Sequence, residues 1–164
     1  IRDYKVTGVQ TCALPIYYFA KAPELLGAVS ALEKAVKESG FDRKLLHLVK
    51  LRASQINGCA YCVDMHVKEA RHDGETEQRI HLISAWRESP LYSERERAAL
   101  EWTEALTLLP QSRADDQFYD PLKAYFSDVE IVQLTVLIGT INVWNRLAVG
   151  FRSQHPIDRP AQAA

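Results

Sequence analysis

The sequence has almost no net charge, and this absence limits its partners. Twenty basic residues stand against 21 acidic residues, which gives a net charge of −1 over 164 residues. Because the two signs alternate in short stretches, the chain creates no field that would attract nucleic acid or anionic lipid. We therefore expect no nucleic-acid partner and no membrane partner.

Cysteine is also scarce. The chain has three cysteines, and two of them, Cys59 and Cys62, form a CxxC pair close to His66. A secreted domain held together by disulfides would need more pairs, whereas a CxxC pair beside a histidine is typical of a catalytic or metal-binding site in a reducing compartment. We therefore expect a cytoplasmic location.

No long hydrophobic run is free of polar residues. The longest apolar stretch, residues 131–151, contains Gln133, Asn142, Asn145 and Arg146, which would be costly in a lipid bilayer. We predict a buried helix here. No strand pattern and no internal repeat is present, and 164 residues with 47% apolar content suit one domain with its own core.

The first sixteen residues have no clear helical or strand period and contain glycine and proline breakers. Residues 6–16 resemble the translation of a common sequencing adapter. We predict that residues 1–16 are an adapter-derived artefact or a disordered segment. Cys12, which lies in this segment, is therefore not expected to contribute to function.

The rest of the chain has the pattern of helices separated by turns. Proline near a helix start, capping residues and glycine stops delimit these segments. The predicted helices begin near residues 23, 42, 59, 75, 93 and 127. We predict an all-α single domain of six to seven helices over residues 17–152, followed by a polar tail at residues 153–164.

The most informative motif is Cys59-Ala-Tyr-Cys62-Val-Asp-Met-His66, which follows Gly58. On a helix, the two cysteines and the histidine fall within a sector of about 60°. A thiolate is the nucleophilic form of cysteine, and a neighbouring imidazole can accept or return its proton. The N-terminus of a helix also stabilises a thiolate. These features favour a redox-active dithiol site at the start of a central helix.

Two other interpretations of the motif remain open. Cys59, Cys62, His66 and His47 could together bind zinc as a Cys₂His₂ set, in a metal-stabilised or redox-sensing interaction protein. Alternatively, the cysteines could be purely structural. Glu69, three residues after His66, could orient the imidazole on the same helix face.

Residues 41–71, FDRKLLHLVKLRASQINGCAYCVDMHVKEAR, closely resemble the core of the alkylhydroperoxidase D-like branch of the carboxymuconolactone decarboxylase superfamily. The resemblance extends over about residues 17–152. It implies an all-helical fold that assembles into trimers or hexamers and acts as a thiol peroxidase. In this family the residue matching Cys62 becomes the sulfenic acid, and the residue matching Cys59 resolves it.

The resemblance further implies that His66 relays the proton. It also shows one departure, because His47 stands where the family has a glutamate, twelve residues before Cys59. A histidine there could still act through water, but it cannot supply a fixed negative charge. His47 is therefore kept among the expected site residues, as a departure from the family pattern.

The resulting expectation is an antioxidant enzyme that reduces hydrogen peroxide or small organic hydroperoxides. The sequence has no flavin, haem or nicotinamide fingerprint, so we expect no cofactor and an external dithiol as reductant, either a lipoylated or a thioredoxin-like protein. A lactone decarboxylase is a less favoured alternative, because that branch of the superfamily does not use a CxxC pair.

Overall fold

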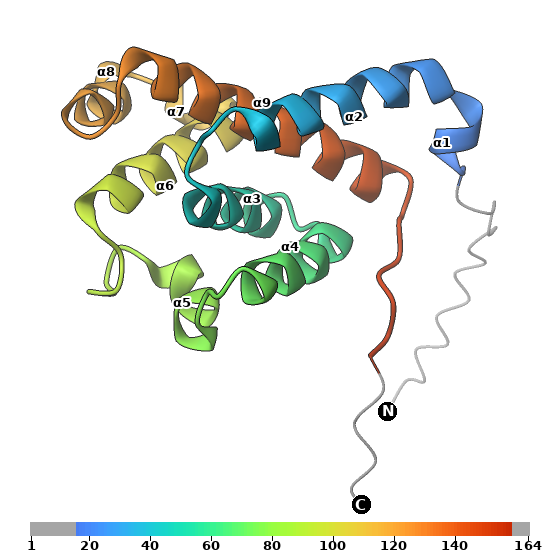
Figure 1. The fold of residues 1–164 in the computed structure, drawn as a ribbon, viewed down its shortest axis with the longest axis horizontal. Helices are drawn as coiled ribbons and strands as arrows, with labels where there is room; N and C mark the ends of the chain where they lie inside the picture. The colour runs from blue at the N-terminus through green and yellow to red at the C-terminus, as the bar shows by residue number, and fades with distance from the viewer. Residues whose placement is uncertain (1–15, 159–164) are drawn as a thin grey trace, which may run out of the picture.

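The computed structural model describes residues 16–158, and these residues form helices joined by short connections (Figure 1). The helices are α1 (Tyr18–Lys21), α2 (Pro23–Glu38), α3 (Arg43–Ile56), α4 (Ala60–His72), α5 (Glu77–Leu82), α6 (Glu94–Thr107), α7 (Leu109–Ser112), α8 (Asp116–Tyr119) and α9 (Asp128–Gly150), with 3₁₀ turns at Ile83–Ala85 and Asp120–Ala124. No strand occurs within this range. The predicted all-α fold is confirmed.

The number of helices differs from the predicted six to seven. Three of the helices in the described range, α1, α7 and α8, have only four residues each. One turn is too short to show a helical period in the sequence, which explains why these elements were not predicted. The longer helices match the predicted segments, except that the segment expected over residues 75–88 is helical only from Glu77 and continues as a 3₁₀ turn at Ile83–Ala85. The predicted segment at residues 1–16 lies, apart from Ile16, outside the described residues.

Side-chain caps fix where the long helices begin. The carboxylate of Asp42 accepts a hydrogen bond from the Leu45 amide at 3.0 Å at the start of α3. Ser93 and Ser127 each form a capping box, with Glu96 and Glu130 respectively. These are the residue types that satisfy free amides at a helix N-terminus, so the sequence determines these starts locally.

Helix α3 forms the centre of the domain. It packs against α4, α6 and α9, and Figure 1 shows α2 and α9 along one side of it with α4 on the other. Every residue from Leu45 to Leu51 is buried. The end of α3 leads through Asn57 and Gly58 into the cysteine pair, so the core directly supports the start of α4.

Polar side chains of α9 form hydrogen bonds that hold this helix in the core. By length and composition alone this helix could cross a membrane, but half of its most apolar window is buried inside the domain. The Asn57 side-chain amide donates to the side-chain oxygens of Asn142 and Asn145, at 3.0 and 2.9 Å. Asn145 in turn donates to the Ser54 hydroxyl at 3.0 Å. These bonds satisfy buried polar groups and tie α9 to the turn before the cysteines.

Candidate functional site

The two cysteines lie at the N-terminus of α4, as the motif predicts. Cys59 is the N-cap residue, and its sulfur accepts a hydrogen bond from the Cys62 amide at 3.3 Å. The two side chains are joined in a disulfide, with their Cα atoms 5.3 Å apart. Both residues are only 2% exposed. The described structure therefore represents the oxidised form of the dithiol pair.

A cavity of about 270 Å³ lies against this pair, between α1, α2, α4 and α9. Cys62 lines the cavity, whereas Cys59 is not among its lining residues in the described part of the chain. The apolar part of its wall is formed by Tyr18, Phe19, Tyr61, Met65, Trp144 and Ala148. A small molecule with an apolar group that entered this cavity would thus meet Cys62 rather than Cys59.

His66 lines the same cavity and is held in one orientation. Its Nδ1 donates to the Glu69 carboxylate at 2.8 Å, and the ring is 2% exposed. Because a carboxylate only accepts, the proton of a neutral imidazole sits on Nδ1, which leaves Nε2 as an acceptor. Among the described residues this buried Nε2 has no hydrogen-bond partner. The ring therefore presents a free basic nitrogen.

Burial and the Glu69 carboxylate shift the pKa of His66 in opposite directions. Burial lowers the pKa of His66 and outweighs the Glu69 carboxylate, which raises it. The hydrogen bond from His66 is the main cause that lowers the pKa of Glu69 to about 2. At neutral pH the pair is thus a neutral imidazole on an ionised carboxylate, which is the state that a general base needs. The contact between Glu69 and His66, which the sequence offered as one possibility, is present in the structure.

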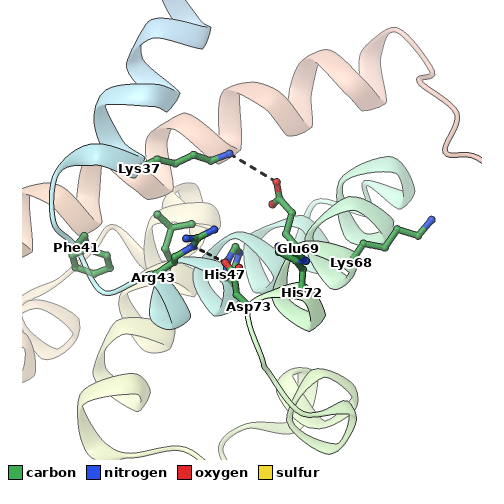
Figure 2. Close-up of a pocket in the computed structure, with 9 residues that line it drawn as sticks. Lys37, Phe41, Arg43, His47, Lys68, Glu69, His72 and Asp73 are labelled. Carbon is green, nitrogen blue, oxygen red and sulfur yellow. Dashed lines mark hydrogen bonds and ion pairs between the residues drawn. The ribbon is translucent and has the colours of Figure 1, made fainter.

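His47 lies in a second, larger cavity of about 590 Å³, shown in Figure 2. Its Nε2 donates to the Asp73 carboxylate at 2.5 Å, and Arg43 contacts the same carboxylate at 2.6 Å. Lys37 and Glu69 line both cavities, and Figure 2 shows them reaching toward each other from α2 and α4, at 3.8 Å. The structure thus places Cys62 and His66 at one cavity, with Cys59 bonded to Cys62, and places His47 at the neighbouring cavity. The catalytic roles expected for these four residues stay predictions.

Sequence reasoning missed a buried ion pair beside the cysteine cavity. Lys50 has no exposed surface, and its ammonium donates to Glu33 of α2, a residue that lines the cavity. Apolar residues surround Lys50 on both sides in the sequence, which was the available signal for burial of this lysine. Its partner could not be found in this way, because Glu33 lies 17 residues earlier on another helix.

The zinc alternative is not supported by the geometry. The two sulfurs are bonded to each other, and His47 is paired with Asp73 in the other cavity. Between residues 16 and 158 no group of three or more histidine, cysteine or acidic side chains is arranged to hold a metal ion. The Cys₂His₂ set considered from the sequence is therefore not assembled.

Comparisons with known proteins agree with the fold. The carboxymuconolactone decarboxylase family matches residues 23–105. The chain is 42% identical over 134 residues to the uncharacterized protein YdfG of Bacillus subtilis (strain 168), and this match covers 82% of the chain and 91% of YdfG.

Two solved structures extend the comparison. ATU0492 from Agrobacterium tumefaciens, of unknown function and described with a suggested role as antioxidant defence protein AhpD, has 58% identity and a TM-score of 0.86, over 88% of this chain and 99% of that one. The debrominase Bmp8 has 24% identity and a TM-score of 0.77, over 84% of this chain and 74% of that one. At this lower identity, the second likeness concerns the fold alone.

Proposed function

Because the chain belongs to the carboxymuconolactone decarboxylase family, in its alkylhydroperoxidase D-like branch, we propose that it is a thiol peroxidase acting in antioxidant defence. Its substrates would be hydrogen peroxide or small organic hydroperoxides. The observation that carries the proposal is that Cys62 lines one cavity with a buried imidazole whose Nε2 has no hydrogen-bond partner in the described part of the chain. A buried structural disulfide would need neither the cavity nor the base.

In the first step, the reduced Cys62 thiol gives its proton to His66 Nε2, and the thiolate attacks the terminal oxygen of the hydroperoxide. A sulfur–oxygen bond forms while the oxygen–oxygen bond breaks, so that sulfur is oxidised and the peroxide is reduced. The alkoxide, or hydroxide, that leaves takes the proton from His66. The products are a Cys62 sulfenic acid and an alcohol or water.

In the second step, the sulfur of Cys59 attacks the sulfenic sulfur of Cys62. A sulfur–sulfur bond forms, the sulfur–oxygen bond breaks, and the hydroxide leaves as water with the Cys59 proton. The N-cap position of Cys59 suits this step, because its sulfur already contacts the start of α4 at the Cys62 amide. The product is the disulfide seen in the structure.

An external dithiol would then return the pair to thiols and become a disulfide itself. We propose a lipoylated or thioredoxin-like protein as this reductant. Such a cycle needs a reducing compartment, which agrees with the expected cytoplasmic location.

We also propose that the protein forms a homotrimer or homohexamer. Val129, Val132, Val136 and Val143 are exposed on α9, and their spacing places them within a sector of about 60°. Exposed apolar side chains that share one face of a helix are typical of a contact surface between subunits. Light scattering after size exclusion measures the assembly directly, and a monomer would contradict this part of the proposal.

Peroxide consumption with dithiothreitol as donor tests the proposed activity. We expect turnover in the unsubstituted chain and in Cys12→Ser, and its loss in Cys59→Ser and Cys62→Ser. Cys12→Ser is the matched control, since it removes the one cysteine outside the pair. Turnover that survives in both variants of the pair would contradict the proposal.

A further inference from the structure

Glu33, one of the residues that line the cysteine cavity, carries a second buried acceptor besides the imidazole. Glu33 lines the cavity, and its Oε2 is buried without a hydrogen-bond partner among residues 16–158, as is Nε2 of His66. Buried acceptors are rarely left unpaired in a folded protein, so each one needs an explanation. Here the two atoms belong to residues that line the same small space as Cys62.

Two lysine ammonium groups hold the other oxygen of the Glu33 carboxylate, Oε1. Its Oε1 accepts from the buried ammonium of Lys50 and lies 3.5 Å from the ammonium of Lys37. Both lysines thus contact the same oxygen, which leaves the other oxygen free. Burial lowers the pKa of Lys50, and Glu33 is the main group that opposes this shift. The ion pair is therefore a costly arrangement for a site with a purely structural role.

We propose that Glu33 is a substrate-binding residue, whose Oε2 accepts the hydrogen bond of the hydroperoxide O–H and directs the terminal oxygen to the sulfur of Cys62. This inference rests on the proposed function. The apolar wall formed by residues such as Phe19 and Trp144 would hold the organic group. Glu33 and His66 would thus recognise the two ends of the peroxide bond separately.

This assignment keeps the reaction balanced. The hydrogen held by Glu33 stays on the terminal oxygen and becomes the hydrogen of the sulfenic acid, so Glu33 gains no proton. The leaving oxygen takes its proton from His66, which received it from the Cys62 thiol. The charges of Lys50 and Lys37 offset that of the carboxylate, so a thiolate can form nearby.

Rapid-mixing kinetics of the reduced protein test the assignment. The rates of Cys62 oxidation by cumene hydroperoxide and hydrogen peroxide are compared with the rate of its reaction with methyl methanethiosulfonate, which needs the thiolate but has no O–H. In Glu33→Gln we expect the peroxide rates to fall about tenfold or more, the loss expected for one hydrogen bond to a charged group. The thiosulfonate rate should change less than about twofold. Glu38→Gln, at an exposed position of the same helix, is the matched control and should react like the natural chain.

The double variant Glu33→Gln with Lys50→Met separates substrate binding from ion pairing. It also removes the unpaired buried lysine, so it can be measured even if the single variant folds poorly. Slow peroxide reaction in the double variant supports the assignment. Recovery of the natural rate there would overturn it, because Glu33 would then act only as the counter-ion of Lys50. A natural rate in Glu33→Gln would overturn it as well and leave the proposed function standing. A natural chain that reacts with the thiosulfonate but not with peroxides would contradict both.

Discussion

Two buried histidines of this protein differ in which ring nitrogen is paired. His66 uses Nδ1 for its carboxylate, Glu69, whereas His47 uses Nε2 for Asp73, and within residues 16–158 the other nitrogen of each ring has no partner. Nε2 is at the tip of the side chain and Nδ1 is next to its base. The unpaired nitrogen of His66 is therefore the one farther from the backbone, and that of His47 is the one nearer to it.

The residues around the two histidines also differ. Cys62 lines the same cavity as His66, and in the proposed mechanism its reduced thiol gives its proton to Nε2. At His47 the carboxylate is shared with Arg43, which makes the group a link between α3 and the end of α4. The comparison shows that two buried histidine and carboxylate pairs of one domain can leave different ring nitrogens unpaired among the described residues, and our proposal assigns the base to the pair that leaves Nε2.

The largest expected effect on the rate separates the two histidines. Each is replaced by an amide that keeps its hydrogen bond to the carboxylate. In His66→Asn the amide nitrogen replaces Nδ1 toward Glu69, but no base remains at the tip. In His47→Gln the amide nitrogen replaces Nε2 toward Asp73. We expect the rate of Cys62 oxidation by peroxide to fall about 100-fold in the first variant, as for loss of a general base, and much less in the second. An equal loss in His47→Gln would show that His47 belongs to the catalytic machinery.

A smaller effect on the rate is expected from replacing the carboxylates that pair with the histidines, Glu69 and Asp73. Glu69 raises the pKa of His66, so Glu69→Gln should shift the acid limb of the pH–rate profile to lower pH. It should also reduce the maximal rate by roughly tenfold, because the imidazole loses its orienting partner. Asp73→Asn is the comparison variant, in which we expect the limb to keep its position. The profile is measured from pH 4.5 to 8 with single-turnover oxidation, and an unmoved limb in Glu69→Gln would contradict this account.

The smallest effect concerns stability rather than rate. Because burial lowers the pKa of His66 below 6.5, the unfolded chain binds a proton at mildly acidic pH that the folded chain does not. This contribution to the free energy of unfolding is fully present above about pH 6.5 and is lost as the pH falls. His66→Asn should remove at most about 1.4 kcal/mol per pH unit from the slope, as expected for one proton. Urea unfolding of the oxidised protein at several pH values measures it, and an identical slope in the variant would indicate that folding does not shift the pKa of His66.

The sequence predicted the part of the site that lies on one helix. Cys59, Cys62, His66 and Glu69 have spacings that bring them together on α4, whatever the rest of the domain does. The capped starts of α3, α6 and α9 were predictable for the same reason. Local geometry determines all of these features.

The contacts between helices could not be predicted in this way. The partner of Lys50 is Glu33 on α2, and the partner of His47 is Asp73 at the end of α4. Such pairs depend on how the helices pack, and spacing within a single segment carries no information about them. The resemblance to a known family directed attention to position 47, but only packing shows that its side chain turns to a different cavity.

The most direct test of the central claim is to identify which sulfur meets the peroxide. Reduced Cys59→Ser and Cys62→Ser are each treated with one equivalent of cumene hydroperoxide in the presence of dimedone, and the adduct is located by mass spectrometry. We predict a sulfenic-acid adduct on Cys62 in Cys59→Ser and none on Cys59 in Cys62→Ser, because Cys62 lines the cavity with His66. An adduct mainly on Cys59, or none in either variant, would contradict the account.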